Sequence, residues 1–208
     1  MGGPDWWRGE SPAAAPRGLP GRGLVTGPVE ELPSVEADPV SGLRRPYFFA
    51  ASVSDTFLGL DDVSLTVEWS DFTNVHFRQR TRPITNERGF SAQGSFGNSP
   101  AYYRDCVFEG VRFKQLGGFT LSRGWFERCT FINCRWEGHF AMSASLVDCT
   151  FSGRMNGCAW FGGSERGPNV HRGNDFSAVQ FTNNVGWRSS FPIHNQRWPE
   201  GYVPPTNV

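Results

Sequence analysis

Large apolar residues recur every five positions through the middle of the chain, and this spacing is the clearest pattern in the sequence. A small or readily buried residue, such as Cys129 or Cys149, stands two places before several of them. An α-helix gives a period of 3.6 and a strand a period of 2, so neither element alone explains the pattern. The large residues of this core series are Leu121, Phe126, Phe131, Trp136, Leu146, Phe151, Phe161, Phe176 and Phe181.

A second repeat is nested inside the first. The tripeptide Cys129-Thr130-Phe131 returns as Cys149-Thr150-Phe151, twenty residues later. Four sides of five residues make a square coil, and coils stacked at a strand spacing of ~4.8 Å place each residue above the one twenty positions earlier. The pattern therefore predicts an all-β solenoid with an apolar interior, stabilised by the stacking of neighbouring coils. The predicted stacks are Phe131 with Phe151, Phe126 with Leu146, and Phe161 with Phe181.

Several short motifs along the chain resemble the pentapeptide-repeat family. They are Asp71-Phe72, Asp105-Cys106-Val107-Phe108, Arg128-Cys129-Thr130-Phe131, Asp148-Cys149-Thr150-Phe151 and Asn174-Asp175-Phe176. The resemblance covers about residues 57–186, and it implies a right-handed quadrilateral β-helix. The tail segment Arg197-Trp198-Pro199-Glu200-Gly201 is similar to the segment that closes some members of the family.

Composition shifts along the chain predict three regions. Residues 1–43 are rich in Gly and Pro without periodicity, which is typical of a disordered leader. Residues 44–186 carry the β-helix pattern, with loop insertions expected near 81–100 and 162–174, where Pro, Gly and polar residues interrupt it. Residues 187–208 combine aromatic residues with prolines that stop a strand, so we expect a C-terminal cap.

Charge and cysteine content narrow the class of protein. Twenty basic and twenty acidic residues cancel, so no global field favours nucleic acid or an acidic membrane. No apolar run approaches the ~20 residues of a membrane span, and no secretory signal is recognisable. The five cysteines occupy apolar positions, which favours reduced thiols in a cytoplasmic protein over a disulfide framework.

Candidate chemistry is sparse. Cys129, Cys134 and Cys149 are close on the coil, but the five- and twenty-residue spacings already assign them to the core, and we favour core thiols over a metal site. Cys129 and Cys149 stack within disulfide reach, yet we expect both to be free. No nucleophile, base and orienting group converge in the sequence, so we predict a non-enzyme without cofactors. The alternative is an activity carried by the loops, with Glu87, Asn98 and His171 as candidates.

The remaining interpretation is a scaffold that binds a protein partner on its outer faces and loops. Tyr103, Trp160 and Trp187 are candidate anchors, because we expect them to lie off the inward positions. Arg78, Arg80 and Arg82 form a small basic patch with Arg44 and Arg45, too small for a nucleic-acid groove. Trp6 and Trp7 stand beside Arg8 in the leader, where they are candidates for a docking motif.

The family resemblance suggests a second function. Some pentapeptide-repeat proteins resemble B-form DNA in shape and charge, bind type II topoisomerases such as DNA gyrase, and protect them from inhibitors. Such mimicry requires a surface dense in carboxylates, whereas basic residues outnumber acidic ones within residues 44–186. Gyrase binding therefore stays the less favoured interpretation. Solenoids of this kind also pair through an end, so the C-terminal tail is expected either to cap the coil or to form a homodimer.

Overall fold

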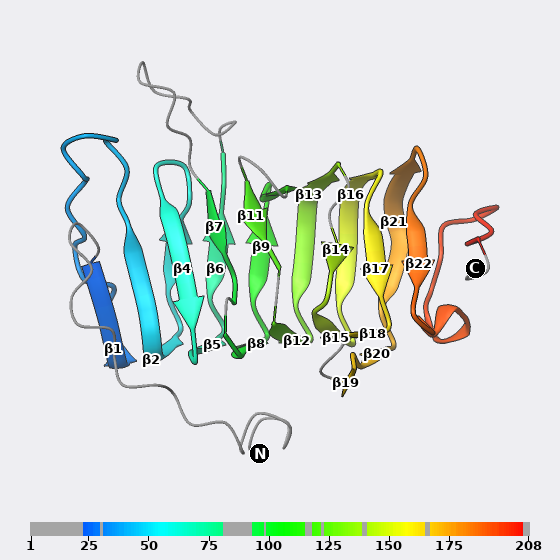
Figure 1. Cartoon of the computed structure of the whole chain (residues 1–208), viewed down its shortest axis with the longest axis horizontal. Helices are drawn as coiled ribbons and strands as arrows, with labels where there is room; N and C mark the ends of the chain where they lie inside the picture. The colour runs from blue at the N-terminus through cyan, green and yellow to red at the C-terminus, as the bar shows by residue number, and fades with distance from the viewer. Residues whose placement is uncertain are drawn as a thin grey trace.

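Strands from successive coils lie side by side and form an all-β parallel β-solenoid of about six turns (Figure 1). The fold is that of a computed structural model that describes residues 23–29, 31–80, 93–97, 99–114, 118–121, 123–138, 141–164 and 167–205. Within these ranges the secondary structure consists of strands and one short 3₁₀ helix, η2 (Ile193–Asn195). The predicted fold class is confirmed.

Two faces of the solenoid are continuous ladders of short parallel strands. The first face contains the second half of β2 (Pro46–Ser54), then β5 (Asp71–Thr73), β8 (Ala101–Arg104), β12 (Gly124–Glu127), β15 (Ser145–Val147) and β20 (His171–Arg172). The second face contains β3 (Phe57–Gly59), β6 (His76–Arg78), β9 (Val107–Glu109), β13 (Thr130–Glu137), β16 (Thr150–Asn156) and β21 (Asp175–Thr182).

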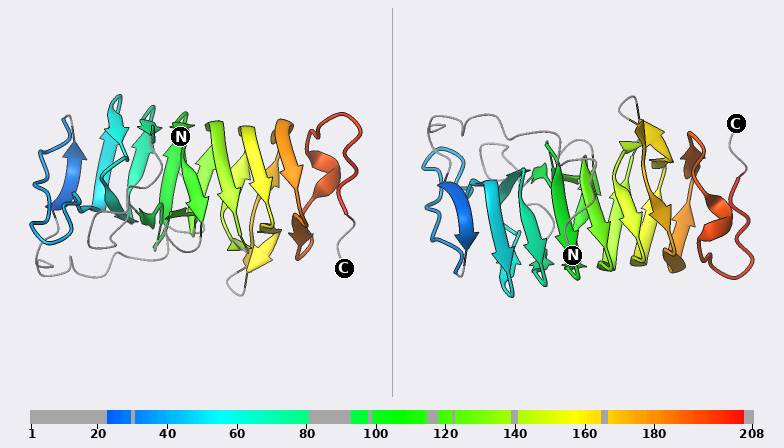
Figure 2. Two further views of the ribbon diagram at one scale, coloured as in Figure 1. Left: turned by 90° about the horizontal axis from the view of Figure 1, so that it is seen from above. Right: turned by 90° about the horizontal axis from the view of Figure 1, so that it is seen from below.

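The other two faces complete each coil. The third face is made by β10 (Arg112–Lys114) and the second halves of β13, β16 and β21. The fourth contains β1 (Gly23–Val29), the start of β2, β4 (Ser64–Glu68), β7 (Gln93–Ser95) and β11 (Phe119–Thr120), and it continues as a separate sheet of β14 (Ala141–Met142), β17 (Ala159–Phe161) and β22 (Gly186–Arg188). Figure 2 shows the ladders from two further sides.

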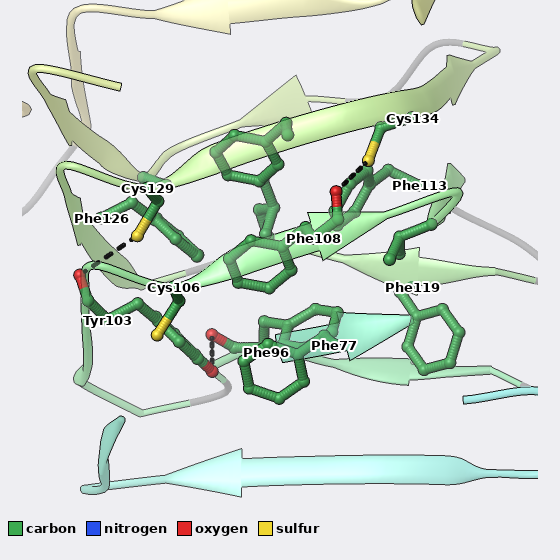
Figure 3. Close-up of a cluster of buried hydrophobic side chains, with 14 of the residues drawn as sticks. Phe77, Phe96, Tyr103, Cys106, Phe108, Phe113, Phe119, Phe126, Cys129 and Cys134 are labelled. Atoms are coloured by element: carbon green, nitrogen blue, oxygen red, sulfur yellow. Dashed lines mark hydrogen bonds between the residues drawn. The ribbon is translucent and has the colours of Figure 1, made fainter. Parts of the chain in front are cut away.

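Stacked aromatic rings fill the interior. On the second face Phe77, Phe108, Phe131, Phe151 and Phe176 stack in order, with ring centroids 4.9, 4.8, 4.6 and 4.5 Å apart. These distances match the strand spacing, so one ring per coil is enough to fill this column. The buried thiols lie beside the rings, and Cys129 donates to the Tyr103 carbonyl while Cys134 donates to that of Phe108 (Figure 3).

The corner between the first and second faces requires a left-handed backbone. Asp and Asn tolerate this conformation better than other non-glycine residues, which explains why they stand three positions before most inward residues of the second face. Arg128 is the exception, and its guanidinium bonds to both carboxylate oxygens of Asp105, at 2.8 and 2.9 Å. The corner residues with positive φ are Asp55, Asn74, Asp105, Arg128, Asp148 and Gly173.

The core series is confirmed in the regular coils and fails near the C-terminal end. Most of its members are buried, and Phe131 pairs with Phe151 and Phe126 with Leu146, as predicted. The predicted stack of Phe161 with Phe181 is wrong, because Phe161 pairs with Arg188 and Phe181 with Met155. Phe161 is half-buried, and Phe181 packs partly buried against the core.

Gly153 explains the change of register. It pairs with Cys134 across a register shift, so the side from Phe151 to Met155 is one residue shorter than the side from Phe131 to Trp136. Gly153 has a φ of 112°, and a Cβ there would lie 2.1 Å from the Cys134 carbonyl oxygen. A one-residue slip exchanges inward and outward positions, so Trp160 replaces Phe161 in the core.

The region boundaries differ from those predicted. Residues 23–29 form β1, which pairs with β2, so the ordered part begins before residue 44, and residues 1–22 lie outside the described residues. In the first predicted loop, β7 and the buried Phe96 belong to the coil, while residues 81–92 lie outside the described part. The second loop contains a small antiparallel pair, β18 (Gly163–Ser164) and β19 (Gly167–Pro168).

The C-terminal tail closes the last coil. Trp198 stacks on Phe176 with ring centroids 5.1 Å apart, and Tyr202 stacks on Phe181 at 4.2 Å. The Trp187 indole donates to the Tyr202 hydroxyl at 3.3 Å. The aromatic columns therefore continue into the tail, which caps the end as expected.

Candidate partner-binding surface

Five residues on the outer surface of the second face form one group, which we call the Phe57 face. It consists of Phe57, His76, Arg78, Glu109 and Ile132. Phe57 aligns with His76 on adjacent strands, and Arg78, Glu109 and Ile132 align in the next row. Because side chains alternate across a strand, these residues flank the inward positions and point away from the core.

Ring and charge contacts fix the side chains of the Phe57 face relative to one another. The Arg78 guanidinium lies over the Phe57 ring at 4.6 Å from the centroid, and the Phe57 and His76 rings meet edge to face at 5.4 Å. His76 Nε2 lies 2.8 Å from a Glu109 carboxylate oxygen. A cation held over an aromatic face is stabilising even at an exposed site, so the arrangement is preorganised.

The Phe57 face contains two exposed apolar side chains. Phe57 is 46 % exposed and Ile132 is 37 % exposed, and both are among the large exposed apolar residues in the described part of the chain. Arg78 and Glu109 separate them and are themselves partly exposed. Aromatic and arginine side chains within an exposed patch are typical of contact surfaces between proteins.

A pocket of about 390 Å³ opens beside Phe57 at the N-terminal end of the solenoid. Its walls are mostly aliphatic and aromatic, and they come from two sources: the first coil and the segment of residues 32–35 that crosses the end of the coil. The lining residues are Val25, Leu32, Pro33, Ser34, Val35, Arg44, Pro46, Phe48, Phe57, Leu58, Gly59 and Val63.

The one charge among those lining residues is already paired. Arg44 donates from Nε and one terminal nitrogen to the two carboxylate oxygens of Asp62, at 2.9 and 2.5 Å. These hydrogen bonds lower the pKa of Asp62 and raise that of Arg44, with burial acting in the opposite direction. The pocket is therefore an apolar space without a net charge on its walls.

Three of the predicted partner-binding residues are in the core. Tyr103, Trp160 and Trp187 are each at most 1 % exposed, so the expectation that they face outward is wrong. Tyr103 stacks between Phe72 and Phe126 on the first face, and it stands five residues before Phe108, so the repeat itself places it inward. Trp160 and Trp187 stack on each other on the fourth face, after the register change at Gly153.

The predicted basic patch is divided by its ion pairs. Arg44 pairs with Asp62, and Arg45 lies 3.9 Å from Asp38. Arg78 lies over Phe57, while Arg80 is exposed and its backbone N–H donates to Asp61. Trp6 and Trp7 lie outside the described residues.

Phe57, Ile132 and the pocket are not among the residues predicted from the sequence to bind a partner. Phe57 precedes the inward Leu58 and Ile132 follows the inward Phe131, so both are apolar residues at outward positions of the repeat. That signal was available in the spacing. The pocket had no such signal, because its second wall comes from a segment without periodicity.

The groups considered for chemistry are buried or undescribed. The five cysteines are free and buried, and burial raises the pKa of Cys129 and Cys134, and that of Cys158 to about 12. His171 is buried, with its Nε2 3.0 Å from the Phe161 carbonyl oxygen. Glu87 and Asn98 lie outside the described residues. Within the described ranges, no cluster of three or more His, Cys, Asp or Glu side chains is arranged to hold a metal ion.

Ion pairs recur along the outside of the solenoid. Arg128 pairs with Asp105 of the preceding coil. Further pairs join Asp148 to Arg172, Asp175 to Arg197 and Glu137 to Arg112, at 3.6, 3.4 and 4.0 Å. Many outer carboxylates thus lie beside a guanidinium. No helix in the described part of the chain is long and apolar enough to span a membrane.

Comparisons with known proteins yield little. No protein-family model matches the chain, and no curated protein matches its sequence. One solved structure with some similarity is a trypsin-treated variant of QnrB1, a plasmid-mediated fluoroquinolone resistance protein. The match covers 71 % of this chain and 79 % of that one, at 14 % identity and a TM-score of 0.18. A TM-score this low carries no argument about fold or function.

Proposed function

We propose that this protein is a non-catalytic scaffold of the pentapeptide-repeat type that binds a protein partner through the Phe57 face. The observation that carries the proposal is the exposed Phe57 ring, held between Arg78 and His76 on a rigid ladder of strands. Exposing an apolar ring to water is unfavourable in free energy, and a partner that covers the ring removes this unfavourable exposure.

The chemistry of the Phe57 face indicates the kind of partner. Phe57 and Ile132 provide apolar contact area, while Arg78 and the exposed Arg80 add positive charge near Phe57. A complementary surface has an apolar side chain flanked by carboxylates, because opposite charges steer association and fix orientation. The rigid coil would lose little conformational entropy on binding.

The topoisomerase interpretation has less support. Imitation of DNA requires rows of unpaired carboxylates, but Asp62, Asp105 and Asp148 each lie beside an arginine. An exposed pair of this kind contributes little stability, yet it neutralises the surface charge that mimicry needs. We therefore favour recognition through the Phe57 face.

Affinity capture with the full chain tests the proposal. The double variant Phe57→Ala/Arg78→Ala removes the ring and its cation. We expect the amount of partner captured to fall at least about tenfold, because hot-spot residues contribute about 2 kcal/mol or more each to the binding free energy. The matched control is Val170→Ala/Arg172→Ala, an exposed apolar residue and an exposed arginine on another part of the solenoid.

The two double variants give a clear decision. Retention of the partner by Phe57→Ala/Arg78→Ala, or equal loss in both double variants, contradicts the proposal. Trp6 and Trp7 stay a predicted docking motif, and a Trp6→Ala/Trp7→Ala variant of the full chain tests them separately. If only the Trp6→Ala/Trp7→Ala variant loses the partner, the binding site lies in the N-terminal segment and not on the Phe57 face.

A further inference from the structure

The pocket at the N-terminal end has the properties of a small-molecule site. Its volume of about 390 Å³ lies near the lower end of the ~300–1,000 Å³ range of ligand pockets. Phe48 and Val63 on the coil side are almost fully buried, and Leu32 on the covering side packs against the core. The exposed surface of the pocket walls is more apolar than polar.

The covering wall is held in place independently of any ligand. Asp38 accepts hydrogen bonds from the Ser41 N–H and hydroxyl at 2.7 and 2.8 Å, and its backbone N–H donates to the Leu43 carbonyl at 2.9 Å. Ala37 forms a bridge with Arg44, which joins this turn to the first coil. Next to this turn, Val35 packs so closely on Gly23 that a Cβ at Gly23 would lie 2.7 Å from it. The pocket is thus preformed.

The electrostatics of the pocket select against charged ligands. Arg44 is the only charged residue among the described residues of the lining, and Asp62 holds its guanidinium through two hydrogen bonds. An anion entering the pocket would lose its hydration while meeting a cation that is already neutralised, and burial of an uncompensated charge is costly. A neutral apolar molecule loses no such hydration and gains contact with the exposed ring of Phe57.

We propose that the N-terminal pocket is a binding site for a small neutral apolar ligand, such as an aromatic molecule, enclosed between the first coil and residues 32–35. The pocket would bind a small molecule, whereas the Phe57 face would bind a protein. The pocket needs the covering wall, whereas the Phe57 face needs Arg78 and Ile132, which are not among the pocket residues.

Two related fluorescent probes test the proposal on the full chain. N-phenylnaphthylamine is neutral, and anilinonaphthalene sulfonate has the same ring system with a sulfonate added. We expect saturable binding of the neutral probe at one site per chain, and at least about tenfold weaker binding of the sulfonate, equivalent to about 1.4 kcal/mol. A sulfonate that binds as well as the neutral probe overturns the proposal, as does the absence of saturable binding of the neutral probe.

Variants of the covering wall locate the bound probe. Leu32→Trp places a large ring in the pocket, and we expect it to weaken binding of the neutral probe at least about tenfold by occupying the same volume. Glu36→Trp adds the same ring to the same segment at an exposed position outside the lining and should leave binding unchanged. Val35→Phe is a second filling variant, in case Leu32→Trp unfolds. Equal binding by the filling variants and Glu36→Trp assigns the probe to another surface and rejects the pocket.

Discussion

The two ends of the solenoid are closed in different ways. At the C-terminal end Trp198 and Tyr202 continue the aromatic columns, stacking on Phe176 and Phe181 with ring centroids 5.1 and 4.2 Å apart. At the N-terminal end residues 32–35 cross the coil with mostly aliphatic side chains, Ser34 being the exception, and border a pocket of about 390 Å³. A solenoid must cover the ends of its core, and among the described residues the ring stacking that fills the coils continues only into the C-terminal end.

The C-terminal end is therefore filled by side chains, whereas the N-terminal end has space for a ligand. The C-terminal cap adds polar closure as well, because Gln196 accepts from the Asn174 side chain at 2.9 Å and donates to the His171 carbonyl at 3.3 Å. The N-terminal cover is tied to the coil mainly at its far side, through Asp38 and Arg44. The following changes test how far the two ends differ in stability, beginning with the largest expected effect.

Replacing Trp198 with alanine should open the filled end. The variant removes a ring that contacts Phe176, Phe181 and Trp187, and loss of a large packed aromatic residue typically costs about 3–5 kcal/mol. Because Trp198 is only partly buried, we expect a loss of about 3 kcal/mol in the free energy of unfolding, measured by urea denaturation. Trp198→Phe keeps a stacking ring and should lose less. A loss below about 1 kcal/mol in Trp198→Ala would show that the tail does not cap the core.

Acid should weaken the same end selectively. Burial lowers the pKa of His171 to about 4, only partly opposed by its hydrogen bond to the Phe161 carbonyl, whereas an unfolded histidine has a pKa of about 6.5. The folded state therefore binds fewer protons than the unfolded state. The contribution of neutral His171 to the free energy of unfolding is complete above about pH 6.5. It falls by about 3 kcal/mol as the pH is lowered to about 4.

A matched variant isolates this titration. His171→Leu copies Leu146, which precedes it in the same column, and should flatten the stability curve between pH 6.5 and 4. Hydrogen exchange localises the effect: residues 191–198 should lose protection in acid before residues 31–43, because Phe191 packs on the His171 ring at 4.4 Å. An unchanged slope in His171→Leu contradicts the assignment to this group.

Truncating the covering wall should have the smallest effect. Leu32 already borders an empty space, so Leu32→Ala removes fewer contacts than truncation of a residue in a filled core, and we expect a loss of about 1 kcal/mol or less. The measurement is the same urea titration as for Trp198→Ala. A loss as large as that of Trp198→Ala would mean that the two ends are equally important for stability, and the comparison would fail.

The regular coils were predictable because each side chain there has a local reason for its position. The return of Cys129-Thr130-Phe131 as Cys149-Thr150-Phe151 sets the register, and the structure pairs Thr130 with Thr150 and Phe131 with Phe151. Prediction failed after Gly153, where one residue is lost from a side and Trp160 becomes buried. A glycine in the sequence does not by itself indicate a register shift, because the shift at Gly153 depends on the close approach of the Cys134 backbone.

The candidate surface was only partly predictable. The sequence predicts Arg78 and Arg80 at the surface, where the structure has them, whereas its prediction that Tyr103, Trp160 and Trp187 face outward is wrong because all three occupy inward positions of the coil. Phe57 and Ile132 lay within reach of the same five-residue spacing, as apolar residues beside inward ones. The contact of Arg78 with Phe57 could not be predicted from this spacing, because it joins residues on adjacent coils.

The sequence by itself determined the architecture of the protein: the four-sided coil, the aromatic columns and the positions of the corner residues. These follow from short-range spacing, which acts on every coil in the same way. Only the tertiary structure decided how the ends close, which rings lie outside, and where a pocket remains. Those features depend on segments distant in sequence, such as residues 32–35 over Val63 or Trp198 over Phe176, and no local pattern encodes how completely two such segments fill the space between them.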